Sequence, residues 1–217
     1  MPLIFGVRSP LVVEIQETLN RCGVEVKAGI SVNGIPRTID TLEIVTLDGL
    51  GRGSAGQTFI ACAFSPERRE QLVEMALAFG LVPMPALIDP TAILARSVRV
   101  GHGSFLNAGV IVGAVSAIED HVLVNRAASI GHHCLISDFV SIGPGATLAG
   151  NVHVGTGAMI GAGATILPDI RIGKNAIIAA GSLVRKHVAE GSFVAGNPAL
   201  ERPFNRQGSS LHVDDGE

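Results

Sequence analysis

The sequence has no tryptophan and no tyrosine, and it is poor in charged residues of either sign. Asp, Glu, Lys and Arg make up 16% of the 217 residues, with 16 basic residues against 19 acidic ones. A protein that binds a nucleic-acid backbone by releasing counterions needs a surplus of basic residues, so nucleic acid is excluded as the main partner. A disordered chain is rich in charges and poor in apolar residues, whereas 47% of this chain is hydrophobic.

Cysteines and long apolar runs are also scarce. Cys22, Cys62 and Cys134 are too few and too scattered for a disulfide framework or a zinc cluster, and this predicts a reducing, cytoplasmic location. No stretch reaches the ~18 uninterrupted apolar residues of a membrane span, and the start has no basic leader, so we expect neither a span nor a secretory signal. The mean hydropathy of +0.43 then indicates small aliphatic residues in a regular core and a buried subunit interface.

A six-residue period of aliphatic residues runs through most of the chain. Starting at Ile88 and stepping by six, every position to Val184 is Ile, Leu or Val. The position two residues earlier is never larger than Val except at Ile170, and the position that follows is often Gly or Asn, residues that tolerate a positive φ at a corner. Three such segments make one 18-residue turn and place each residue ~4.8 Å from the residue 18 positions later. The period predicts a parallel β-helix of the hexapeptide type over residues 85–190.

Residues 1–84 lack this period and alternate between strand and helix patterns. Strands are expected for PLIFGV, EVKAGIS, TFIACAF and LVPMPALI, and helices for PLVVEIQETLNRCG and SPERREQLVEMALAFG. This alternation predicts a small Rossmann-like α/β domain with a parallel sheet. The Gly-rich stretch 32–57 has no assigned structure, and residues 191–217 are expected to form a C-terminal extension with a mobile end.

These features together resemble one family. The repeats, the closing VAGNPA of Val194–Ala199, the IDPTA of Ile88–Ala92 and the α/β front are similar to the hexapeptide-repeat sialic-acid O-acetyltransferases and nucleotide-amino-sugar N-acetyltransferases. The resemblance covers nearly the whole chain to about residue 203. It implies a left-handed coil, a homotrimer, acetyl-CoA as the donor and active sites between neighbouring subunits.

The family's catalytic stretch corresponds here to residues 125–142. Asn125 and His132 match the family pattern, and the resemblance implies that His132 is the general base. The family has an acid directly after this histidine, where this chain has His133, and a second histidine that contacts the acetyl end of the donor, where this chain has Ser141. His133 either orients His132, replaces it or has no role, and the hydroxyl of Ser141 can still donate a hydrogen bond.

The period adds a geometric argument about the donor site. His132 follows a Gly corner and is expected to point outward, and Gly150 lies 18 residues later, one coil above it. A residue without a side chain there lets a thioester approach a backbone N–H that can act as an oxyanion donor. The resemblance adds Ala162 and Ala180 as donor-site positions beside Ser141 and Gly150, although small residues recur throughout the repeat.

The resemblance assigns the acceptor to the N-terminal domain. The family places a Gly-rich turn after its first strand, and this chain has GVRSP, in which Gly6, Arg8 and Ser9 are the candidate binding residues. Arg8 offers a charge and Ser9 a hydroxyl to a diphosphate. The acid that the family often places after its second strand is missing, and Ser31 and Asn33 stand nearby; an ordinary tight turn is the alternative interpretation.

The other histidines are expected to be solvated and without function. They are His102, His121, His153, His187 and His212. The coil also occurs in metal-dependent carbonic anhydrases, but their H-x₄-H pair is absent here, so no metal site is expected.

The sequence therefore predicts an acetyl-CoA-dependent N-acetyltransferase that acts on a nucleotide-linked amino sugar. Transfer is expected to be direct, because Cys134 falls on an inward position and no nucleophilic cysteine is available for an acyl-enzyme. O-acetylation of a sugar, as of a sialic acid, is one alternative, and a catalytically degenerate trimeric scaffold is the other. Three aliphatic residues that the period turns outward are expected at a subunit interface: Leu123, Leu135 and Met159.

Overall fold

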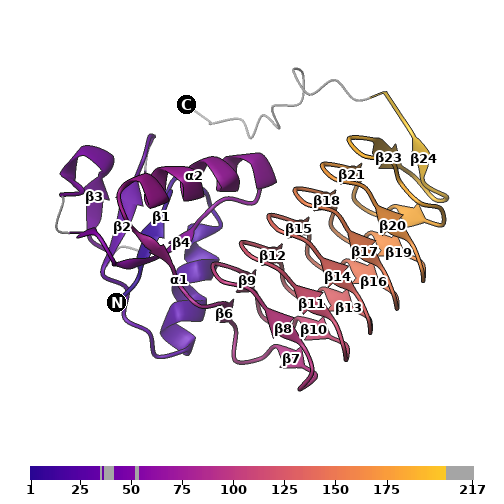
Figure 1. Cartoon of the computed structure of the whole chain (residues 1–217), viewed down its shortest axis with the longest axis horizontal. Coiled ribbons are helices and arrows are strands. Elements are labelled where there is room, and N and C mark those ends of the chain that lie inside the picture. Colours follow the sequence, from indigo (N-terminus) through magenta and orange to yellow (C-terminus); the bar gives the residue numbers. More distant parts are fainter. Residues whose placement is uncertain (35, 37–41, 52–53, 204–217) are drawn as a thin grey trace.

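The computed structural model of the chain describes residues 1–34, 36, 42–51 and 54–203. A small α/β domain packs against one end of a long triangular coil of short strands (Figure 1). Within the described residues, no helix is both long and apolar enough to cross a bilayer.

The α/β domain is a five-stranded parallel sheet in the order β3-β2-β1-β4-β5. This is a doubly wound arrangement whose switch point lies between β1 and β4. Side chains alternate between the faces of β1, so that Ile4 packs in the cluster with α1 and Phe5 in the cluster with α2. The elements are β1 (Leu3–Phe5), α1 (Val12–Arg21), β2 (Ala28–Ser31), β3 (Ile44–Thr46), a 3-10 turn (Leu47–Gly49), β4 (Thr58–Ala61), α2 (Pro66–Ala78) and β5 (Val82–Pro83).

Both helices follow from their sequences. α1 turns Ile15 and Leu19 into the core, and α2 begins at a Ser65 N-cap whose hydroxyl accepts a hydrogen bond from the N–H of Arg68. The expected single strand LVPMPALI is wrong, because the segment splits into β5 and β6 (Leu87–Ile88). Pro85, which has no N–H, stands at the break between them.

The coil has three flat faces, and from β6 to β22 each strand pairs in parallel with the strand 18 residues away. The first face contains β6, β9 (Phe105–Leu106), β12 (Leu123–Val124), β15 (Ser141–Ile142), β18 (Met159–Ile160), β21 (Ile177–Ile178), β23 (Phe193–Ala195) and the antiparallel β24 (Leu200–Glu201). The second contains β7 (Ile93–Leu94), β10 (Ile111–Val112), β13 (Ser129–Ile130), β16 (Thr147–Leu148), β19 (Thr165–Ile166) and β22 (Leu183–Val184). The third contains β8 (Arg99–Val100), β11 (Ala117–Ile118), β14 (Leu135–Ile136), β17 (His153–Val154) and β20 (Arg171–Ile172).

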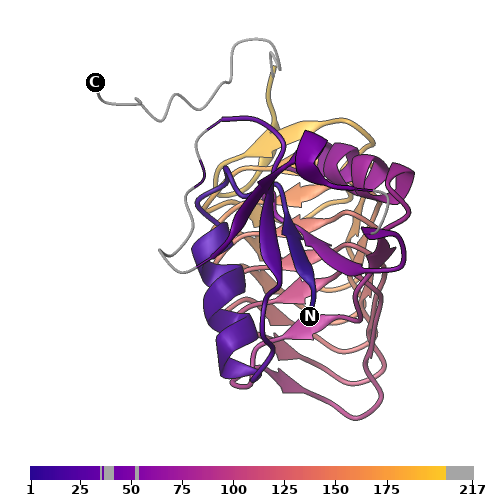
Figure 2. The same ribbon diagram turned by 90° about the vertical axis from the view of Figure 1, so that its left-hand side faces the viewer.

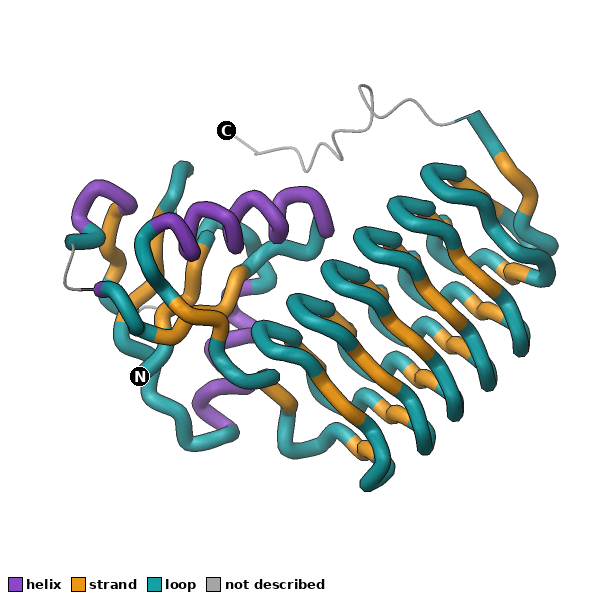
Figure 3. Tube along the Cα trace, viewed as in Figure 1, coloured by secondary structure: helices purple, strands orange, loops and turns teal. Residues whose placement is uncertain are grey.

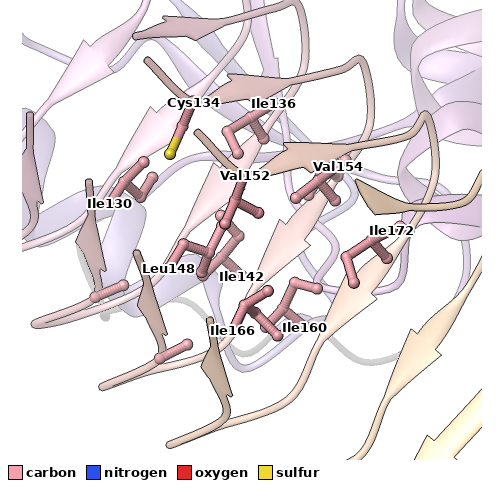
Figure 4. Close-up of a cluster of buried hydrophobic side chains, with 14 of the residues drawn as sticks. Ile130, Cys134, Ile136, Ile142, Leu148, Val152, Val154, Ile160, Ile166 and Ile172 are labelled. Carbon is pink, nitrogen blue, oxygen red and sulfur yellow. The ribbon is translucent and has the colours of Figure 1, made fainter. Parts of the chain in front are cut away.

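The aliphatic period is the core of the coil. Ile130, Ile136, Ile142 and Leu148 are each at most 1% exposed and stack inside the triangle (Figure 4). The repeat that the sequence predicts is therefore confirmed. The turns that join the faces are called here the first, second and third corners, after the face that each one follows (Figure 3).

The glycines at the corners serve a different purpose from the one expected. The positive φ angles fall two residues later, at positions such as His133 and Asn151, and not at the residue directly after the aliphatic one. That residue is often glycine because the next coil lies against it. A Cβ on Gly131 would lie 2.6 Å from the carbonyl carbon of Ala149, closer than any side chain tolerates.

The α/β domain covers the first coils of the first face (Figure 2). Leu123 is 1% exposed and packs in the same cluster as Ile15 and Ile60. The expectation that Leu123 faces solvent or another subunit is therefore wrong, because its own N-terminal domain buries it.

Arg69 of α2 ties the two parts together. Its side chain is buried, and burial lowers the pKa of its guanidinium to about 9, which leaves it charged at neutral pH. It donates hydrogen bonds within 3.1 Å to six oxygen atoms, those of the carbonyls of Ala63, Phe64, His121, Phe139 and Val140 and the hydroxyl of Ser141. Both domains supply these oxygens, so the cation fixes the angle at which they meet.

Candidate active site

Two exposed histidines form a hydrogen-bonded pair at the second corner. The chain leaves β13 at Gly131 and turns through His132 and His133 into β14. The two Nδ1 atoms lie 3.0 Å apart, and the rings stand nearly perpendicular, at 87°. One Nδ1 must carry the proton and the other must accept it. When His132 is the donor, its Nε2 is unprotonated and free to act as a base.

Gly150 lies directly above the His132 ring, as the 18-residue spacing predicts. A Cβ on Gly150 would lie 2.6 Å from Cε1 and 2.7 Å from Nε2 of His132. The N–H of Asn151 donates to the carbonyl of His132 over 2.8 Å, whereas the N–H of Gly150 donates to no described residue. A backbone donor therefore remains available next to the imidazole.

Asn125 lies at the first corner, beside a cavity between the coil and the α/β domain. The cavity has a volume of about 330 Å³ and is lined by Ser9, Pro10, Leu11, Glu14, Phe64, Asn125 and Arg126. It opens at the carboxyl ends of β1 and β4, where doubly wound sheets bind their ligands. The structure thus brings Ser9 and Asn125 together. It does not bring Asn125 and His132 together within one chain, since they lie at opposite ends of β13.

The other predicted acceptor residues do not line this cavity. Gly6 has a φ of +94° and is buried, and a Cβ there would lie 2.5 Å from Cδ1 of Leu72. Arg8 is exposed, and its side chain lies close against the backbone of Gly34.

Ser141 is not placed for the predicted contact with the donor. It is fully buried, its hydroxyl donates to the carbonyl of Phe64 over 2.5 Å, and it accepts from Arg69 over 2.9 Å. That expectation is corrected here, because the α/β domain covers the position. Ala162 and Ala180 are exposed on the first corner, one coil apart, in the column of residues that stacks above Arg126.

His121 also departs from expectation. It is 7% exposed, and its ring stacks on that of Phe139 with the centroids 5.2 Å apart. Burial lowers the pKa of its imidazole, and its Nδ1 has no hydrogen-bond partner among the described residues. His102 and His187 are exposed and His153 is half-buried, whereas His212 lies outside the described residues.

Three polar residues around Asn125 were not predicted as part of the site. Glu14 lines the cavity and forms an ion pair with Arg126, and Asn107 donates to both Glu14 and Asn125. The 18-residue spacing of Asn107 and Asn125 is the one signal in the sequence that links any of them. No group of three or more His, Cys, Asp or Glu side chains in the described part of the chain is arranged to hold a metal ion.

Comparisons with known proteins bear on the fold and the class of enzyme. The family Bacterial transferase hexapeptide (six repeats) matches residues 133–168 and 151–186. A mutant of the perosamine N-acetyltransferase of Caulobacter crescentus, solved with CoA and GDP-perosamine, superposes over 93% of this chain and 96% of its own, with a TM-score of 0.85 and 28% identity. The chain carries the hexapeptide repeat and is an acyltransferase. Its coil is accordingly the left-handed parallel β-helix, as the resemblance implies.

Two further solved structures are similar to this chain over both of its domains. The acetyltransferase domain of PglB from Neisseria gonorrhoeae, solved with acetyl coenzyme A, is 29% identical with a TM-score of 0.80, and covers 92% of this chain and 98% of its own. WeeI from Acinetobacter baumannii is 25% identical with a TM-score of 0.83, over 93% and 99% of the two chains. A search of curated proteins found no match.

Proposed function

We propose that the protein transfers the acetyl group of acetyl-CoA to the amino group of a nucleotide-linked amino sugar. The likeness to the perosamine N-acetyltransferase carries this proposal, because it extends over both domains and that enzyme was solved with CoA and a nucleotide-linked amino sugar. The cavity at the switch point of the α/β domain supplies a place for such an acceptor.

In the proposed reaction His132 is the general base. The neutral amine attacks the thioester carbonyl carbon, and Nε2 of His132 takes the proton that the nitrogen loses. The unpaired N–H of Gly150 donates to the oxyanion, and the carbon–sulfur bond then breaks. His132 returns the proton to the departing thiolate. His133 holds His132 in the tautomer whose Nε2 is free.

The proposed site is shared between two subunits of a homotrimer. One chain holds Asn125 and the cavity at its first corner and His132 at its second, so a neighbouring subunit has to supply the missing half. Four large aliphatic residues near the second corner are exposed and suit such an interface: Ile93, Ile111, Val115 and Leu135. Sedimentation is expected to give three times 22.4 kDa, and a monomer would contradict the shared site.

The test is release of free thiol from acetyl-CoA with UDP-, GDP- and dTDP-linked amino sugars. One acceptor is expected to support turnover, and His132→Ala is expected to lower kcat by about 10²-fold or more. Turnover that survives this substitution would move the base to His133. A product cleaved by mild base would be an ester and would indicate O-acetylation, whereas an amide resists it. A trimer that neither binds acetyl-CoA nor releases thiol would indicate a scaffold.

A further inference from the structure

At the first corner, the residue that follows each strand changes from polar to small beyond Asn125. The residues directly after the strands of the first face are, coil by coil, Asp89, Asn107, Asn125, Gly143, Gly161 and Ala179. The first three carry polar side chains, and the last three leave the backbone bare. Asn125 is thus the last polar residue of this column. Asn125 lines the acceptor cavity. The small residues of the later coils, along which the donor is proposed to bind, begin one coil beyond it.

Backbone amides fix which way both asparagine side chains face. The N–H of Arg126 lies 2.8 Å from Oδ1 of Asn125, and the N–H of Ala108 lies 2.7 Å from Oδ1 of Asn107. A backbone N–H can only donate, so each of these side-chain atoms must be the oxygen. Nδ2 of Asn107 therefore faces Glu14 and Asn125.

Asn107 is 1% exposed, and its NH₂ group is fully used. Nδ2 donates to Oδ1 of Asn125 over 3.1 Å and to Oε2 of Glu14 over 3.3 Å. The other carboxylate oxygen of Glu14 accepts from Arg126. Oδ1 of Asn125 thus accepts two hydrogen bonds, and that side chain cannot rotate without breaking both.

The consequence is a free donor at the edge of the cavity. Nδ2 of Asn125 has two N–H groups and no partner among the described residues. A neutral amine has only one lone pair, which it needs for attack on the thioester. The NH₂ group is therefore suited to an oxygen atom, from the thioester carbonyl or from the sugar.

We propose that Asn107 is a positioning residue that holds the Asn125 NH₂ group toward a reacting or neighbouring oxygen atom in the cavity. Glu14 supports it by accepting the second N–H of Asn107. This inference rests on the proposed acetyl transfer for its effect on rate, but the hydrogen-bond arrangement itself is independent of that proposal.

The test is a double-mutant cycle with Asn107→Asp and Asn125→Ala. Aspartate has the same shape, but it presents an oxygen where Nδ2 was and repels Oδ1 of Asn125, so the Asn125 side chain must turn. Alone, Asn107→Asp is expected to lower kcat/KM by about 10- to 100-fold, as loss of a donor in an active site does. With Asn125→Ala already present, it is expected to change kcat/KM by less than about 3-fold. Asn175→Asp, at the third corner, is the matched control and is expected to leave kcat/KM unchanged.

The kinetic pattern also separates the two sources of the oxygen. A thioester oxygen predicts that Asn107→Asp lowers kcat with little change in KM for the sugar, and a sugar oxygen predicts a raised KM. An equal loss of kcat/KM in both backgrounds would mean a general structural defect and would overturn the proposal.

A second measurement does not depend on activity. The side-chain NH₂ resonances of Asn125 are identified by their disappearance in Asn125→Ala, and they are expected to shift in Asn107→Asp and to stay in place in Asn175→Asp. Unmoved resonances would overturn the positioning role. If the native chain released no thiol with any acceptor, the proposed function would fail, and this spectrum would still decide the role of Asn107.

Discussion

At the scale of single residues, the His132–His133 pair differs from a histidine oriented by a carboxylate. The two Nδ1 atoms lie 3.0 Å apart, and only the arrangement in which His132 donates the hydrogen bond leaves Nε2 of His132 free. His133→Phe keeps a ring at this positive-φ position, which Phe139 occupies on another corner, but it removes the hydrogen bond. We expect kcat to fall about 10-fold, because a positioned general base accelerates a reaction by about 10²- to 10⁴-fold and loss of its orienting partner removes only part of that acceleration. Steady-state rates measure this, and His102→Phe, also exposed, should leave kcat unchanged.

Gly150 allows an equally direct test. In Gly150→Ala the new Cβ would lie 2.6 Å from Cε1 of His132, so the imidazole must move. Because a displacement of about 1 Å can cost 10²-fold in rate, we expect a loss of that order in kcat with an unchanged circular-dichroism spectrum. Gly51→Ala, whose Cβ would meet nothing within 4 Å, is the control. Full activity of Gly150→Ala would remove the proposed donor from this corner.

The sequence predicts some contacts of the site but not others. The position of Gly150 above His132 follows from counting 18 residues. The contact between Asn107 and Glu14 joins positions 93 residues apart and depends on how the α/β domain docks, which no periodicity encodes. The burial of Ser141 and His121 has the same cause, because neither the resemblance that assigned Ser141 to the donor site nor the expectation that His121 is solvated took the docked α/β domain into account.

At the scale of elements, the strands of the coil were predictable because one inward residue in six must be large and aliphatic. The corners were less predictable. Glycine after the aliphatic residue suggested a positive φ, but at Gly131 glycine is needed because the next coil approaches too closely for a side chain. β3 and its 3-10 turn fall in the stretch that had no assigned structure. That stretch has neither a period of two nor one of 3.6 to reveal them.

Helix α2 supplies a prediction about stability. Arg69→Ala would remove a donor from six oxygen atoms, of which, within the described residues, only the Phe64 and Val140 carbonyls keep another donor, from the Ser141 hydroxyl and the Leu123 N–H. Buried acceptors without partners cost about 1–3 kcal/mol each, so we expect the free energy of unfolding to fall by more than about 3 kcal/mol in urea titrations. The neighbouring Arg68 makes only exposed hydrogen bonds. Arg68→Ala should therefore change stability by less than about 0.5 kcal/mol, and equal losses would contradict the role given to Arg69.

At the scale of the whole molecule, the three faces of the coil have different surroundings. The α/β domain covers the beginning of the first face and buries Leu123 and Phe105, whereas Ile93, Ile111 and Leu135 on the other two faces stay exposed. The sequence indicated an excess of outward aliphatic residues, but it did not show which of them the chain covers itself.

The separation of Asn125 and His132 by the length of β13 has a consequence for mixed assemblies. If each site takes Asn125 from one subunit and His132 from the next, a variant impaired at Asn125 and a variant impaired at His132 should complement each other. A trimer assembled at random from equal amounts of Asn125→Ala and His132→Ala chains would contain an intact pair at about one site in four. Refolding the two variants together is therefore expected to restore about a quarter of the native rate, whereas each variant refolded alone is expected to stay at least about 10-fold below the native rate.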